Sequence, residues 1–134
     1  MKIYSDTIRV YNIHLESIRL NADDYIYLTS SSDSQSDYKG NTRQIVKKLM
    51  LAYKKRAKQV NILSKHIDES PYPVLISGDF NDTPVSYTYH QLASDYQDAF
   101  EFKGSGIGNT LIGKLPAFRI DYVLYDPSFT VLSY

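Results

Sequence analysis

Apolar and polar residues alternate with the period of a β-strand in two segments, residues 7–15 and 118–124, and this pattern predicts two strands. The first strand has His14 near its end. The second carries Arg119 and Asp121 on the face opposite its apolar residues. Because a charged pair within an apolar strand is costly without partners, Asp121 is predicted to face a polar cavity. The alternative is an ordinary ion pair between Asp121 and Arg119 or a neighbouring strand.

A third strand is predicted by the apolar run Val74-Leu75-Ile76, which leads directly into Gly78-Asp79-Phe80-Asn81-Asp82. Side chains alternate between the faces of a strand, so Asp79 and Asn81, two residues apart, point toward one place. A carboxylate binds protons or hard cations, and a carboxamide also donates to anionic oxygens. The pair therefore suits a phosphate ester and a metal ion. The alternative is a turn in which both side chains bond only their own backbone.

A helical period extends from Arg43 to about Glu69, and the resulting helix would be roughly 40 Å long at about 1.5 Å per residue. That length is large for the core of a small domain. Arg56 lies near the centre of the apolar stripe, so it is predicted to pair with a buried carboxylate or with backbone carbonyls. The lysines opposite the stripe are interpreted as a solvated face rather than a nucleic-acid surface. They are Lys47, Lys54, Lys58 and Lys65.

The remaining segments predict shorter elements. Two short helices are expected, one over residues 23–28 capped by Asn21 and one ending near Ala93 capped by Ser86. Residues 29–42 are rich in serine and aspartate, and they are predicted to form a mobile loop. Residues 100–108 are expected to be irregular. Their glycines are interpreted as a flexible loop, because no helix follows that would bind an anion at its N-terminus.

Composition narrows the possible functions. The chain has 134 residues, which predicts one domain. Its 15 basic and 15 acidic side chains cancel, so a polyanion would have to be bound locally. The chain has no cysteine, which excludes disulfides and thiolate metal sites. No apolar stretch approaches the roughly 20 residues of a membrane span, so no membrane contact is expected from this chain, and its localisation is left open.

Three polar signals stand at strand ends, in this order: Asn12-Ile13-His14-Leu15-Glu16-Ser17, Gly78-Asp79-Phe80-Asn81-Asp82 and Arg119-Ile120-Asp121-Tyr122-Val123-Leu124. Together with Arg56-x-x-Gln59 they resemble the endonuclease/exonuclease/phosphatase superfamily over most of residues 7–126. The resemblance implies a four-layer α/β sandwich, with two mixed β-sheets packed face to face and helices outside. It also implies Mg²⁺- or Mn²⁺-dependent hydrolysis of a phosphoester by an activated water.

The same resemblance implies roles for individual residues. His14 matches the histidine that contacts the scissile phosphate and helps the leaving oxygen. Asp79 matches the carboxylate that orients the nucleophilic water or a second metal ion, and Asn81 matches the amide that holds a non-bridging oxygen. Asp121 matches the carboxylate that orients the general-base histidine. Arg56 and Arg119 are expected to support the site.

The chain also departs from the family pattern. Neither the asparagine nor the metal-ligand glutamate of the family's first half is found before His14, and no Ser-Asp-His motif follows Asp121. We therefore expect residues 1–134 to be a single partial domain, the C-terminal portion of such an enzyme. On this interpretation the chain alone is inactive, binds metal weakly or not at all, and is either marginally stable or self-associates through exposed strand edges.

The substrate is left open at this stage. A phosphodiester in a nucleic acid, a phospholipid or a small molecule is the first expectation. A phosphomonoesterase acting on inositol or sugar phosphates is the alternative within the family, since balanced charge does not favour a groove that tracks a nucleic-acid backbone. A non-catalytic binding module that keeps the fold is the alternative from another class.

Overall fold

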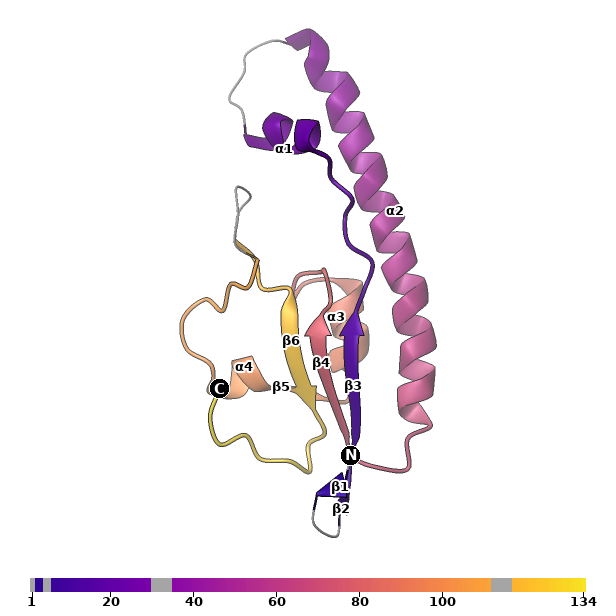
Figure 1. Ribbon diagram of the computed structural model, residues 1–134, viewed down its shortest axis with the longest axis vertical. Coiled ribbons are helices and arrows are strands. Elements are labelled where there is room, and N and C mark those ends of the chain that lie inside the picture. Colours follow the sequence, from indigo (N-terminus) through magenta and orange to yellow (C-terminus); the bar gives the residue numbers. More distant parts are fainter. Residues whose placement is uncertain (1, 4–5, 30–34, 112–116) are drawn as a thin grey trace.

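The computed structural model describes residues 2–3, 6–29, 35–111 and 117–134. Its elements follow one another from the N-terminus as shown in Figure 1. They are β1 (Lys2–Ile3), β2 (Asp6–Thr7), β3 (Arg9–His14), α1 (Ala22–Thr29), α2 (Gln35–Asp68), β4 (Val74–Asp79), α3 (Tyr87–Ala93), β5 (Gln97–Asp98), α4 (Ala99–Lys103) and β6 (Asp121–Tyr125).

The central feature is a four-stranded mixed sheet with strand order β3-β4-β6-β5. Strand β3 runs parallel to β4, whereas β6 runs antiparallel to both β4 and β5. In this register His14 is the partner of Asp79, and Asp79 is the partner of Asp121. The mixed sheet and its helices confirm the expected α/β class and are consistent with the α/β sandwich that the sequence implies. Among the described residues, the other sheet is the two-stranded β1–β2 pair.

The hydrophobic core lies between one face of this sheet and the helices α2 and α3, which run beside it in Figure 1. Alternate residues of β4 and β6 are buried on this face, as the period of a strand requires. The buried cluster consists of Leu15, Val60, Ile67, Val74, Ile76, Phe80, Tyr89, Leu92, Tyr122 and Leu124. The residues between them, including Asp79 and Asp121, therefore belong to the opposite face of the sheet.

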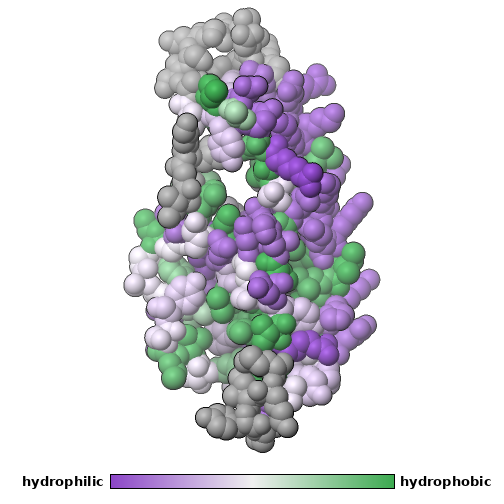
Figure 2. All heavy atoms as spheres, viewed as in Figure 1, coloured by the Kyte–Doolittle hydropathy of each residue, from purple (hydrophilic) through white to green (hydrophobic). Residues whose placement is uncertain are grey.

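Helix α2 presents its charged side to solvent. Figure 2 shows hydrophilic side chains along the outer side of this helix, on the right of the view. Lys47, Lys54, Lys58 and Lys65 are all exposed, as the position of the lysines opposite the apolar stripe predicts. The part of the chain that the structure describes contains no helix with both the length and the apolar composition needed to cross a membrane.

The expected loop over residues 29–42 needs correction at its second half. Helix α2 begins at Gln35 rather than at Arg43, while residues 30–34 lie outside the described residues. Helix α1 packs against α2 through a Lys48–Asp24 ion pair and a 2.5 Å hydrogen bond between the hydroxyls of Tyr27 and Thr42. Thr42, the last residue of the expected loop, is thereby bonded to α1. The residues before it include serine, glycine and asparagine, which favour a helix only weakly, so local propensity did not indicate the earlier start.

The expected irregular segment over residues 100–108 also needs correction. Residues 99–103 form α4, and Asp98 caps this helix by accepting the Phe100 N–H at 2.9 Å and the Glu101 N–H at 3.4 Å. The aspartate followed three residues later by glutamate is a capping-box pattern that was available in the sequence. By contrast, the helices capped by Asn21 and Ser86 are present as predicted.

Two strand predictions can be compared with the sheet directly. Strand β6 begins at Asp121, three residues after the expected start at Phe118, which instead forms an isolated bridge with Leu111. Strand β3 is one edge of the sheet and β5 is the other. Self-association through such edges stays a prediction.

Replacing Ile76 by valine should lower the free energy of unfolding by about 0.5–1.5 kcal/mol, because Ile76 is fully buried at the centre of β4 and loses a methylene from the core. The matched control is Ile107→Val at a position that is 81% exposed, where we expect a change within about 0.5 kcal/mol. Urea unfolding of both variants measures the difference. Equal changes would contradict the packing described above.

Candidate functional site

The candidate site is a row of three polar side chains across one end of the sheet. His14 ends β3, Asp79 ends β4 and Asp121 begins β6. These positions are neighbours in the strand register, and His14 Nε2 lies 3.9 Å from Asp79 Oδ2. The three residues come from segments far apart in the chain, and the mixed strand directions bring them together at one end of the sheet.

The end of β4 depends on a glycine. Gly78 has φ of +137°, and a Cβ at this position would lie 1.9 Å from the carbonyl oxygen of Ile13. No other residue fits so close to β3 at that backbone angle. Asn81 has a positive φ of 51°, a conformation that asparagine tolerates better than most residues. The local sequence is thus shaped by backbone geometry as well as by any chemistry.

Asn81 holds the turn together through both its backbone and its side chain. Its N–H donates to Asp79 Oδ1 at 2.7 Å, and its Nδ2 donates to the carbonyl of Leu15 at 3.0 Å. The first bond is the backbone turn given above as the alternative to a polar site. The second bond uses one of the two amide hydrogens of the side chain. Asn81 therefore has a structural role, and these bonds leave its second amide hydrogen unused.

The environment of Asp79 favours its neutral form. Partial burial, followed in effect by the nearby Asp121 carboxylate, raises the pKa of Asp79 above its usual value of 3.8. The Asn81 N–H, His14 and Arg56 oppose this shift without cancelling it. A carboxyl group with a raised pKa beside an imidazole is a combination suited to proton transfer.

Asp121 does not pair with Arg119, which was the alternative for this residue. Its backbone N–H and that of Ile120 both donate to Thr110 Oγ1, at 3.1 and 3.0 Å. Its side chain is half-buried and belongs to the face that carries Asp79. Thr110 was not singled out from the sequence, because a lone threonine in a glycine-rich segment carries no pattern.

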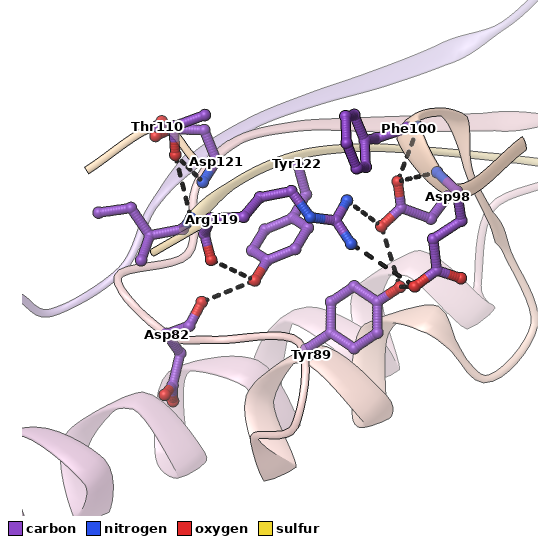
Figure 3. A network of polar contacts seen from close by, with 10 residues as sticks. Asp82, Tyr89, Asp98, Phe100, Thr110, Arg119, Asp121 and Tyr122 are labelled. Carbon is purple, nitrogen blue, oxygen red and sulfur yellow. Dashed lines mark hydrogen bonds and ion pairs between the residues drawn. The ribbon is translucent and has the colours of Figure 1, made fainter. Parts of the chain in front are cut away.

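Arg119 precedes β6 and belongs to the network of polar contacts shown in Figure 3. Its Nη1 donates to Asp98 Oδ2 at 2.6 Å, and its Nη2 lies 3.5 Å from Glu101 Oε1. Tyr89 also donates to Asp98 Oδ2, at 2.9 Å. Although burial alone would lower it, the pKa of Arg119 is raised because Asp98 stabilises the charged form. Arg119 therefore supports the strand that leads into Asp121 rather than facing the row.

Tyr122 joins this network to the turn after β4. Its hydroxyl contacts the carbonyl oxygens of Asp82 at 2.9 Å and Arg119 at 2.8 Å, so its single proton is shared between them. Its ring packs on Phe80 with centroids 4.7 Å apart. One buried tyrosine thus fixes the segment before Asp121 against the segment after Asp79.

Arg56 has the partners that its place in the apolar stripe predicts. It is fully buried, and its Nε donates to Asp82 Oδ2 at 3.0 Å. Its Nη1 donates to the carbonyl of Glu16 at 2.9 Å. One guanidinium on α2 therefore contacts both the segment after β3 and the segment after β4.

The residues described by the structure do not by themselves fit a metal ion. Among them, no group of three or more histidine, aspartate or glutamate side chains is close enough to hold a cation. Mg²⁺ and Mn²⁺ prefer several oxygen ligands, so Asp79 would need further ligands beside it. The metal role of Asp79 stays a prediction.

Comparison with known proteins identifies one family model. The model described as the Endonuclease/Exonuclease/phosphatase family matches residues 14–134. This match includes every residue of the polar row. No curated protein matches the chain significantly.

Three solved structures are similar to parts of the chain. An endonuclease/exonuclease/phosphatase family protein from Bacteroides thetaiotaomicron is 19% identical over 56% of this chain and 32% of its own, with a TM-score of 0.42. A mannosyl-6-phosphatase from the same organism is 19% identical over 56% and 33%, with a TM-score of 0.41. A functionally unknown conserved protein from Enterococcus faecalis is 18% identical over 87% and 37%, with a TM-score of 0.37. The matches thus span about a third of the length of these structures.

Replacing Asp79 by asparagine should stabilise the protein at neutral pH, by an amount of order 1 kcal/mol. Because the folded-state pKa of Asp79 is raised, the folded protein binds more protons than the unfolded chain as the pH rises above about 3.8. The free energy of unfolding therefore decreases as the pH rises above about 3.8, and the ionised Asp79 carboxylate destabilises the folded protein at pH 7. Asparagine removes the cost and can still accept the Asn81 N–H. Unfolding by urea at pH 7 and pH 3.5 measures the effect.

The gain should fall to a small remainder at pH 3.5, just below the usual pKa of 3.8, because the carboxyl group is then mostly protonated in both states. Asp6→Asn is the matched control, since Asp6 is exposed on β2. A stabilisation of Asp79→Asn that is independent of pH would contradict the electrostatic explanation.

Replacing Arg56 by methionine should cost about 3–5 kcal/mol of stability, because Asp82 is then left as a buried and unpaired charge. The double variant Arg56→Met/Asp82→Asn removes that charge. Its loss of stability should be smaller than the sum of the losses in the two single variants by about 1–3 kcal/mol. Urea unfolding of the three variants gives this coupling energy. Additive effects would show that the two side chains do not depend on each other.

Proposed function

Because the chain belongs to the endonuclease/exonuclease/phosphatase family, we propose that its polar row acts in the hydrolysis of a phosphoester by an activated water. A phosphodiester is the first candidate substrate. The observation that carries the proposal is the contact of His14 with Asp79 at one end of the sheet, with Asp121 as the next residue in the row. This is a set of proton-transfer groups at a surface that a substrate can reach.

Asp79 orients the attacking water in this proposal. Its carboxylate has one oxygen engaged by the Asn81 N–H, and the other faces His14. A raised pKa makes Asp79 a better proton acceptor than an ordinary carboxylate. The neighbouring Asp121 contributes to that shift, which is a role for Asp121 in addition to the orientation of a histidine that the family pattern implies.

His14 and Asn81 act on the phosphate in this proposal. The His14 side chain is 73% exposed and can approach a substrate that lies over this end of the sheet. An imidazole at this position can donate a proton to the leaving oxygen near neutral pH. Asn81 keeps one amide hydrogen beyond the one it donates to Leu15. That hydrogen can stabilise the charge that develops on a non-bridging oxygen.

We also propose dependence on Mg²⁺ or Mn²⁺. When bound, such an ion would neutralise phosphate charge and polarise the phosphoryl oxygen. Since the described residues do not supply a complete set of ligands, no step above is routed through the metal. The dependence is open to a direct test by chelation.

A phosphomonoester is the second candidate substrate. The observation that favours it is the balance of 15 basic and 15 acidic side chains. Enzymes that track a nucleic-acid backbone neutralise several phosphates with lysine and arginine, whereas a single terminal phosphate requires only a local site. Inositol and sugar phosphates are the substrates to compare with diesters.

The test is an assay of the natural protein that carries this sequence, with bis(p-nitrophenyl) phosphate as diester and p-nitrophenyl phosphate as monoester. We expect turnover that requires Mg²⁺ or Mn²⁺ and falls at least about 100-fold in Asp79→Ala. Asp6→Ala, at an exposed position on β2, should stay within about twofold of the wild type.

Each proposal has its own contradicting result. If no nitrophenolate is released from either substrate, the proposed hydrolysis is overturned and a binding module is favoured. Full turnover in the presence of a chelator would overturn metal dependence alone. Unchanged turnover in Asp79→Ala would remove the polar row from the reaction.

A further inference from the structure

The chain loses its regular sheet pairing immediately after His14, at the end of β3. The next backbone groups nevertheless all have partners. The N–H of Leu15 donates to the carbonyl of Asp79 at 3.0 Å, and the carbonyl of Leu15 accepts from Asn81 Nδ2 at 3.0 Å. Leu15 is thereby attached to the turn that carries Asp79.

Helix α2 holds the following residue, Glu16, by both of its backbone polar groups. The N–H of Glu16 donates to Gln59 Oε1 at 2.9 Å, and its carbonyl accepts from Arg56 Nη1 at 2.9 Å. Residues three apart on a helix lie on the same face, so Arg56 and Gln59 reach the same residue together. Their side chains take the place of a neighbouring strand where β3 leaves the sheet.

Such support matters because the His14 side chain cannot be fixed by packing. It is 73% exposed, so its position depends on how firmly the backbone is held on each side. Pairing with β4 holds the residues before it. The bonds to Leu15 and Glu16 hold the residues after it. A displacement of a reacting group by about 1 Å can cost on the order of a hundredfold in rate.

We propose that Gln59, with Arg56, is a positioning residue that fixes the His14 imidazole for phosphoester hydrolysis by holding the backbone of Glu16. The proposal rests on the proposed function and adds a residue to it. Arg56 and Gln59 differ in their contacts other than the one with Glu16. Arg56 also neutralises a buried carboxylate, whereas Gln59 is exposed and contributes a single acceptor to the backbone. Gln59 is therefore the residue at which positioning can be separated from folding.

The test compares Gln59→Met, which removes the acceptor at similar volume, with Gln59→Glu, which keeps an acceptor oxygen. Gln44→Met is the matched control, because Gln44 is exposed on the same helix about 22 Å away. Amide hydrogen exchange of Glu16 in the chain should accelerate about fivefold or more in Gln59→Met, the factor that corresponds to one net hydrogen bond. It should stay near the wild-type rate in the other two variants.

The second measurement is the NMR signal of the His14 imidazole in the same variants. We expect it to shift or broaden in Gln59→Met and to keep its wild-type position in Gln59→Glu and Gln44→Met. In the natural protein, kcat for the phosphoester should then fall about tenfold or more in Gln59→Met with KM unchanged. Gln59→Glu should restore kcat to within about twofold.

The failures of this inference and of the proposed function are distinguishable. Wild-type Glu16 exchange and His14 signals in Gln59→Met would overturn the positioning role whether or not the protein turns over substrate. Faster exchange with an unchanged kcat in an active protein would overturn it as well. Absence of phosphoester hydrolysis in the wild-type protein would overturn the proposed function. Hydrogen exchange of Glu16 and the His14 NMR signal would still show whether Gln59 holds the Glu16 backbone and fixes the His14 imidazole.

Discussion

The candidate site depends on one buried guanidinium. Arg56 is fully buried on the inner side of α2 and contacts both Asp82 and the carbonyl of Glu16. A charge in that position is tolerated only when its partners are in place. Because the two partners belong to the segments that follow β3 and β4, the bonds of Arg56 Nε and Nη1 join those segments. The strand register sets the row made by His14, Asp79 and Asp121, and Arg56 fixes the segments that leave two of its three strands.

The turn after β4 combines backbone necessity with chemistry. Gly78 is required by the close approach of Ile13, and Asn81 adopts a left-handed conformation and bonds Leu15. Asp79 sits between them with a raised pKa, which is a local cost in stability at neutral pH. Structural turn and polar site were opposed as alternatives from the sequence alone, yet the same five residues serve as the turn and present the carboxylate. A left-handed residue, Asn81, and a carboxylate with a raised pKa, Asp79, thus lie together in the candidate site. Backbone strain and shifted pKa values are common at functional sites.

Much of this arrangement was predictable from local pattern. The strands ending at His14 and Asp79, the helix ending near residue 69, the caps at Asn21 and Ser86 and the need of Arg56 for a partner all follow from short-range rules. The start of α2 at Gln35 was not predictable in this way, since residues 36–42 include serine, glycine and asparagine, which favour a helix only weakly. Helix α4 was missed although Asp98, followed three residues later by Glu101, is a recognisable capping-box pattern in the sequence. The positions of Thr110 and Tyr122 in the network depend on contacts between distant segments.

The sequence by itself determined which residues are candidates for chemistry and which family the chain belongs to, because motifs at strand ends are local and carry their own spacing. Only the tertiary structure decided that Asp121 lies beside Asp79 and that Arg119 pairs with Asp98 instead. It also decided that Gln59 and Arg56 hold the residue next but one to His14. These contacts join residues that are 21 to 43 positions apart, and such pairs are set by strand order and helix packing, which no local period encodes.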